Sequence, residues 1–113
     1  MKTLKFVPHL IDQILSGEKT STWRLYDDKD LKAGDELELV NKETLKTAAL
    51  AVIEDVAVRK LGALTPADWQ GHEKFTSSDD MYRSYRSYYP DREVGPETEV
   101  KIIKFRLRDR SKS

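Results

Sequence analysis

The chain has 113 residues, of which 38% are hydrophobic and 35% are charged, and it contains no cysteine. This composition fits one globular domain with a modest core, and it excludes disulfides, thiolate metal sites and a cysteine nucleophile. Twenty basic residues balance twenty acidic ones. A net charge of zero argues against a protein that coats nucleic acid by bulk charge, but it is compatible with a local basic cleft.

Targeting and cofactor signals are few. The N-terminus lacks the apolar run of a signal peptide, and no segment approaches the roughly 18–20 apolar residues of a membrane span. We therefore expect a cytoplasmic protein with no membrane partner. The two histidines lie far apart, so we expect no metal and no other cofactor. The sequence leaves the oligomeric state open.

The first quarter of the chain predicts a strand, a helix and a second strand. Residues 4–7 read as a short strand, and Pro8 fits the first turn of a helix. The apolar residues that follow have the spacing of one helical face: Leu10, Ile11, Ile14 and Leu15. We expect the helix to end at Gly17, because glycine readily adopts the left-handed conformation found just past a helix end. A strand should begin at about Thr20.

The remaining elements are separated by turn signals. Three further strands are expected over residues 36–40, 47–59 and 99–108. The polar pair Glu54-Asp55 inside the longest of them indicates either a bulge or the point where the strand leaves the barrel. Thr65 before a proline predicts a helix N-cap, and a second helix over residues 81–89 should stop at Pro90.

These elements predict the α+β class: a small mixed β-barrel of five to six strands, flanked by two to three helices. We expect a single domain over residues 1–109 and a frayed tail at 110–113.

The stretch from Gly17 to Arg24 concentrates the polar chemistry of the first quarter. Alternation along the strand places Thr22 and Arg24 on one face, and Lys19 sits in the preceding corner. A hydroxyl and a guanidinium thus share a rigid strand, with an ammonium three residues before the hydroxyl.

The pattern Gly-x-Lys-x-x-Thr-x-Arg resembles the signature of ASCH domains, small PUA-like proteins associated with RNA. Gly17, Lys19, Thr22 and Arg24 fill its four positions. A glycine-aspartate turn at residues 34–35, ahead of an alternating strand, is also usual in PUA-like barrels. The resemblance implies a PUA-like fold and a cleft of nucleoside or RNA size at the corner.

The same residues predict a hydrolytic mechanism. A threonine hydroxyl needs a base before it can act as a nucleophile. Lys19 can take the proton from Thr22, and Glu73 can pass one to a leaving amine if its turn lies over the corner. This arrangement is similar to that of the ASCH N4-acetylcytidine amidohydrolases. The resemblance implies that Lys19, Thr22 and Glu73 are catalytic, that Arg24 orients loop or substrate, and that the products are cytidine and acetate without a metal.

Two other functions compete with hydrolysis. The last helix carries Arg83, Arg86 and Tyr85, and such groups contact phosphates and stack on unpaired bases. Further aromatic residues there are Tyr82, Tyr88 and Tyr89. These groups predict a non-catalytic module that binds single-stranded RNA, and an ASCH-type ribonuclease is a third alternative.

Each candidate also has a purely structural interpretation. Lys19 can complement the dipole of the preceding helix, and Arg24 can form an ion pair with Asp27 or Asp28. Glu73 can be a solvated loop carboxylate. Most of the tyrosines, at helical spacing, can be core residues with their hydroxyls at the rim.

Overall fold

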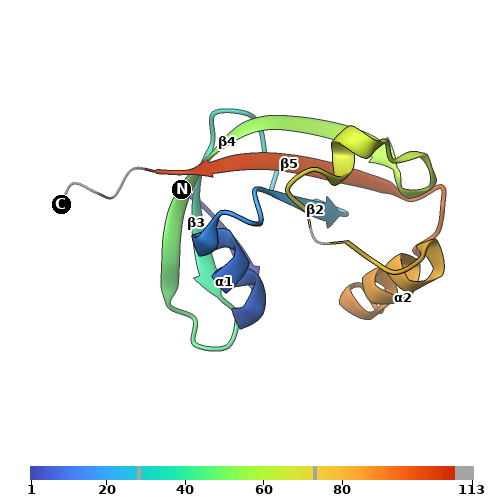
Figure 1. The fold of residues 1–113 in the computed structure, drawn as a ribbon, viewed down its shortest axis with the longest axis horizontal. Helices are drawn as coiled ribbons and strands as arrows, with labels where there is room; N and C mark the ends of the chain where they lie inside the picture. Colours follow the sequence, from blue (N-terminus) through green and yellow to red (C-terminus); the bar gives the residue numbers. More distant parts are fainter. Residues whose placement is uncertain (28, 73, 109–113) are drawn as a thin grey trace.

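The computed structural model describes residues 1–27, 29–72 and 74–108 (Figure 1). The candidate acid Glu73 and the expected tail at 110–113 lie outside these residues. The strands are β1 (Lys2–Phe6), β2 (Ser21–Leu25), β3 (Glu36–Asn41), β4 (Thr47–Lys60) and β5 (Glu99–Leu107). The helices are α1 (Pro8–Ser16) and α2 (Ser78–Tyr88), with short 3-10 turns at η1 (Leu61–Ala63) and η2 (Pro66–Trp69).

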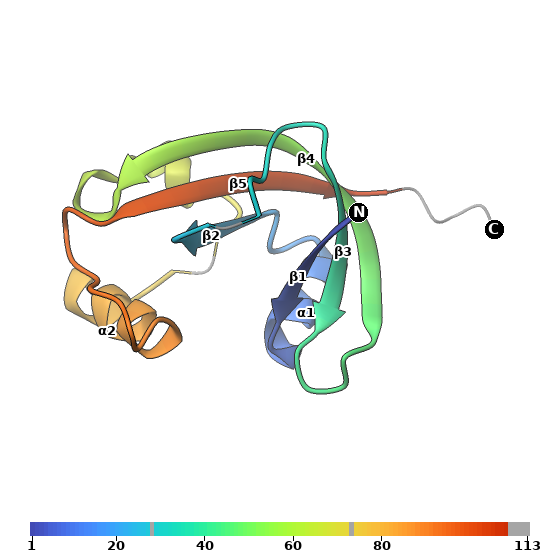
Figure 2. The ribbon, with the colours of Figure 1, turned by 180° about the vertical axis from the view of Figure 1, so that it is seen from behind.

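All five strands form one sheet in the order β1-β3-β4-β5-β2. β1 pairs with β3 in parallel, and the other pairs are antiparallel. The long strands β4 and β5 run the length of the molecule, with α1 and α2 at opposite ends on the same side of them (Figures 1 and 2). The predicted α+β class is therefore confirmed, as a curled five-stranded half-barrel with two α-helices, consistent with the PUA-like fold.

The apolar residues form two cores on the shared strands. The first core packs α1 against β1, β3 and half of β4, and it includes Phe6, Ile14 and Ile53. The second core packs α2 against β2 and the start of β5, and it includes Trp23 and Tyr85. β2 lies between the two groups of elements, so its side chains are covered from both sides.

Local signals explain where the elements begin and end. Gly17 adopts a left-handed conformation with φ of 89° and donates its N–H to the Ile14 carbonyl, as the sequence predicted. The register of β4 against β5 shifts between Ile53 and Asp55, which confirms the predicted bulge. Thr65 and Asp68 form a reciprocal capping box, but only a four-residue 3-10 turn follows.

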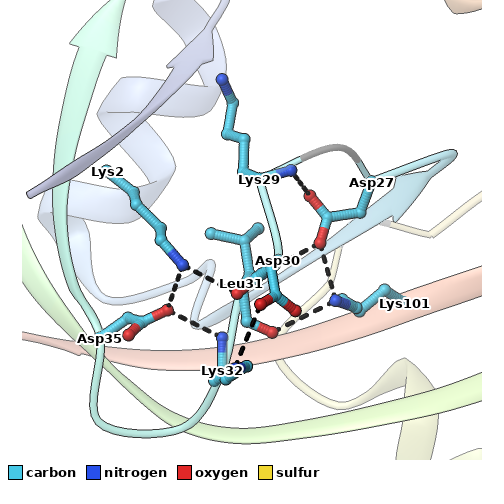
Figure 3. Close-up of polar contacts among 8 residues, drawn as sticks. All are labelled: Lys2, Asp27, Lys29, Asp30, Leu31, Lys32, Asp35 and Lys101. Atoms are coloured by element: carbon cyan, nitrogen blue, oxygen red, sulfur yellow. Dashed lines mark hydrogen bonds and ion pairs between the residues drawn. The ribbon is translucent and has the colours of Figure 1, made fainter.

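A polar network attaches the loop after β2 to the sheet (Figure 3). The Asp27 carboxylate accepts hydrogen bonds from Lys101 Nζ at 2.7 Å and from the backbone N–H groups of Lys29 and Leu31. Burial acts to raise the pKa of Asp27, but these three hydrogen bonds outweigh it and hold the pKa below its usual value. Lys2 similarly connects β1 to the loop through the Asp35 carboxylate, at 2.9 Å.

We expect Asp27→Asn to lower the free energy of unfolding by about 1–3 kcal/mol at pH 7, because Lys101 would lose its carboxylate partner while remaining largely buried. A lowered pKa in the folded state contributes stability above the pKa of the unfolded chain, and this stability is lost as the pH falls through the folded pKa. The difference in stability between parent and variant should therefore begin to shrink as the pH falls below about 4, and it should vanish only below the lowered pKa of folded Asp27. Urea unfolding of both proteins at pH 7 and at pH 3 measures this difference in the free energy of unfolding.

The matched control is Asp30→Asn, whose side chain is 75% exposed and pairs with Lys32. We expect it to change stability by less than about 0.5 kcal/mol at either pH. A loss for Asp27→Asn that does not shrink in acid would contradict the assignment.

Candidate functional site

The corner between α1 and β2 buries a lysine. The Lys19 backbone N–H is bonded to the Gln13 carbonyl, which holds the corner against the end of α1. Its side chain is only 2% exposed, and Nζ donates a 2.8 Å hydrogen bond to the Ser21 carbonyl on β2. A lysine is rarely buried to this extent unless its ammonium has polar partners. Lys19 is thus an internal group of the corner rather than a surface charge.

Arg24 connects the two edge strands of the sheet. Its Nη2 donates to the Lys5 carbonyl on β1 at 3.2 Å, and its guanidinium carbon lies 4.9 Å from the centroid of the Phe6 ring. The carboxylate of Asp27, considered above as a partner for Arg24, pairs with Lys101 instead. Arg24 therefore spans the open side of the half-barrel with one side chain.

A cleft of about 310 Å³ opens between α1 and α2, with β2 at its base. Four of the candidates line it together: Lys19, Thr22, Arg24 and Tyr85. The end of β1, the start of α1, Lys42, His72 and residues 87–89 complete the lining. Thr22 is 4% exposed, and its hydroxyl makes no hydrogen bond with any residue that the structure describes.

The turn at residues 70–72 is fixed to the start of β2. The Gly71 carbonyl accepts hydrogen bonds from the backbone N–H groups of Thr20 and Ser21, at 2.8 and 3.0 Å. Gly71 has a φ of +74°, and a Cβ at this position would collide with Thr20 Oγ1. Only glycine fits there without a shift. The turn that directly precedes Glu73 in the sequence is therefore held beside the Lys19–Thr22 corner.

Aromatic rings form the wall of the cleft toward α2. The His72 ring stacks on Trp23 with centroids 3.9 Å apart and an angle of 15° between the planes. Tyr85 lies near Trp23, and Tyr88 meets Tyr85 edge-on at 5.5 Å. Tyr88 is 58% exposed although it lines the cleft. This wall offers flat surfaces on which another ring can stack.

The other candidates do not reach the cleft. Arg83 is exposed and pairs with Asp80 one turn earlier in α2, at 3.1 Å. Arg86 Nε donates to the Val94 carbonyl at 3.3 Å. Neither arginine lines the cleft. Their role in binding RNA and the placement of Glu73 both stay predictions.

Three residues of the cleft were not singled out from the sequence. His72 lies outside the Gly17–Arg24 motif, and an isolated histidine beside a glycine carries no local signal of burial. Lys5 and Lys42 are far apart in the chain, and they meet the cleft only because β1 and β3 pair in parallel.

Within residues 1–27, 29–72 and 74–108, no three histidine, aspartate or glutamate side chains gather so as to hold a metal ion. In the same residues, no helix is both long enough and apolar enough to cross a membrane.

Several solved structures resemble this chain. A protein from Enterococcus faecalis aligns with a TM-score of 0.75 at 17% identity, over 88% of this chain and 69% of its own. The ASCH domain from Lactobacillus crispatus aligns with a TM-score of 0.70 at 14% identity, over 94% and 79%. The ASCH protein from Zymomonas mobilis aligns with a TM-score of 0.60 at 19% identity, over 95% and 66%. No protein-family model and no curated protein matches the sequence.

These likenesses agree with the topology. The alignments extend over nearly the whole chain, so the likeness concerns the fold as a whole and not one segment of it. The curled five-stranded half-barrel with its two helices is thus the fold of the ASCH domain.

Proposed function

We propose that the cleft hydrolyses the acetyl amide of N4-acetylcytidine to cytidine and acetate. The observation that carries this proposal is the buried Lys19 amine, which shares one cleft with the Thr22 hydroxyl. The cleft volume of about 310 Å³ is near the lower end of the range for small-molecule sites, which suits a ligand of nucleoside size. The motif that carries Lys19 and Thr22 also matches the ASCH amidohydrolases.

The reaction has two steps in this proposal. Thr22 Oγ1 attacks the acetyl carbonyl carbon while Lys19 accepts the hydroxyl proton. The C–N bond breaks as Glu73 gives a proton to the departing N4 amine, which releases cytidine. Water then attacks the acetyl-threonine ester and gives a proton to the Glu73 carboxylate, while the protonated Lys19 returns its proton to Thr22 Oγ1. The ester C–O bond breaks, acetate leaves and Thr22 regains its hydroxyl.

Arg24 has a positioning role in this scheme. Its guanidinium is already committed to the Lys5 carbonyl and to the face of Phe6, so it holds β1 at a fixed distance from β2. Tyr85 and His72, on the opposite wall, border the space that the cytosine ring would occupy.

The direct test is to incubate the protein with N4-acetylcytidine and follow cytidine and acetate by chromatography. We expect the parent to release both products, and Lys19→Met to lose about 100-fold or more in rate because the proton acceptor is gone. Lys46→Met is the matched control, since Lys46 is exposed and does not line the cleft. Circular dichroism establishes that each variant is folded. A folded parent that releases no cytidine, or an active Lys19→Met, would refute the proposal.

Binding of single-stranded RNA without turnover is the second candidate. The exposed ring of Tyr88 at the mouth of the cleft favours it, because such rings stack on unpaired bases. A folded protein that binds RNA with a strong salt dependence and releases no cytidine would establish this alternative.

A further inference from the structure

We infer that residues 54–60 of β4 bind the same residues of a second copy of this chain. The two strands run antiparallel about a twofold axis beside Ala57, and they join the two sheets into one. None of these residues lines the cleft between α1 and α2. The inference therefore does not depend on the proposed function.

This half of β4 has a neighbouring strand on one side only. β3 pairs with β4 as far as Val52, and the loop before β3 extends that contact to Ile53. Pairing with β5, on the other side, continues to Lys60. Among the described residues, β5 is the only element whose backbone bonds to residues 54–60. β4 accordingly forms a border of the molecule in both views (Figures 1 and 2). An open edge of this kind can accept another strand.

Alternate residues of this edge point their backbone groups outward. The Leu61 N–H donates to the Thr98 carbonyl at 2.9 Å, so the odd-numbered residues that precede it bond to β5. In an antiparallel ladder, residues that bond to one neighbour alternate with residues that do not. The N–H and C=O groups of Val56 and Val58 therefore point away from β5. The Val58 carbonyl accepts from the Arg59 side chain at 3.2 Å, which agrees with this direction.

The charges along the edge are arranged for antiparallel pairing with themselves. The segment runs from two acidic residues through an apolar centre to two basic residues: Glu54, Asp55, Val56, Ala57, Val58, Arg59 and Lys60. Rotation about Ala57 places Asp55 opposite Arg59 of the second copy, and Glu54 opposite its Lys60. Val56 then faces Val58, and both have outward N–H and C=O groups. An axis at Val56 or Val58 would lose both ion pairs, and parallel pairing in register would bring like charges together.

The side chains of the edge suit this partner. Val58 is 51% exposed, and the pairing covers it with Val56 of the second copy, on the same face. Arg59 is fixed at the edge because its Nε pairs with Asp68 at 3.3 Å. Asp55 is exposed and has no ion pair with a described residue. Charged residues usually keep edge strands apart, but here opposite charges meet, so they select one partner and one register.

Sedimentation velocity over a range of protein concentrations tests for this dimer. A single pair of strands is a small contact, so we expect a reversible dimer with a Kd on the order of 10–100 µM, which weakens as salt rises. Asp55→Lys should weaken it by at least about tenfold, because like charges then meet at both ends of the paired strands. Asp12→Lys changes the net charge equally at an exposed position of α1, and it should leave the dimer unchanged.

A backbone variant tests the strand pairing separately from charge. Val58→Pro removes only an outward N–H, so the ladder with β5 should persist while the dimer is lost. Val58→Thr is the control, because it keeps both the N–H and the β-branched shape, and it should still dimerise. Circular dichroism establishes that both variants are folded.

Amide hydrogen exchange followed by NMR locates the contact. In dilute protein the N–H groups of Val56 and Val58 should exchange quickly and that of Ala57 slowly, and concentrated protein should slow the first two. A protein that stays monomeric up to about 1 mM would overturn the inference and leave the edge to an extended segment of another protein. A dimer that survives both Asp55→Lys and Val58→Pro would place the contact on another face, and it would also overturn the inference.

Discussion

Thr22→Val is expected to abolish most turnover of N4-acetylcytidine, by a factor of about 100 or more, while the Kd for the substrate changes by less than about threefold. Valine keeps the β-branched shape that strands favour, so the pairing of Thr22 with Ile103 should persist. The Thr22 hydroxyl makes no hydrogen bond to a described residue, so its removal should cost little stability. Rates and affinities are measured separately, by product analysis and by calorimetric titration.

Thr22→Ser is the control, because it keeps the hydroxyl and removes only a methyl group. We expect it to retain measurable turnover. If Thr22→Val turns over substrate as fast as Thr22→Ser, Thr22 is not the nucleophile. If binding and turnover fall together, the hydroxyl contributes to ligand affinity and not to the chemical step.

Trp23→Ala should cause the largest loss of stability, about 3–5 kcal/mol, because it empties the centre of the second core. Trp23 is 3% exposed, and it packs against both Trp69 and His72, with ring centroids 4.6 and 3.9 Å away. Urea unfolding followed by circular dichroism measures the change without relying on the fluorescence of the remaining tryptophan. The aromatic wall of the cleft should loosen in the same variant, which would weaken ligand binding.

Trp23→Phe separates packing from hydrogen bonding. The indole Nε1 is buried and has no hydrogen-bond partner among the described residues, so phenylalanine loses contact area but no hydrogen bond. We expect a cost of about 1–2 kcal/mol. A loss as large as that of Trp23→Ala would mean that the indole N–H makes a contact that packing does not explain.

Much of the fold follows from local sequence signals. The left-handed glycine at residue 17, the capping box of Thr65 and Asp68 and the bulge next to Glu54 all depend on residues close in the chain, and each was predictable. The length of the helix expected after Thr65 was less predictable, because the structure has only the 3-10 helix η2 there, over Pro66–Trp69. A good N-cap begins a helix, but packing decides how far the helix continues.

The site likewise contains residues that local sequence predicts and contacts that depend on the fold. Lys19, Thr22 and Arg24 lie within six residues, so a local sequence motif is enough to predict that they belong to one site. The strand alternation did not show that Arg24 would reach across to the Lys5 carbonyl, because that contact depends on how the sheet curls. The chemistry of Arg83 alone favours a contact with RNA, but the face of α2 that packs inward contains Met81 and Tyr85. Lys42 carried no sequence signal of its own.

The two long strands determine how this small protein must fold. β4 contributes Ala49 and Ile53 to the first core, and its Ala57 packs against the second. β5 likewise contributes Phe105 to the first and Val100 to the second. Neither core can open without withdrawing strands from the other, so unfolding should be a single cooperative transition. The pairing of β2 with β5 waits for residues nearly eighty positions apart to meet, which makes folding slow for a chain of this length.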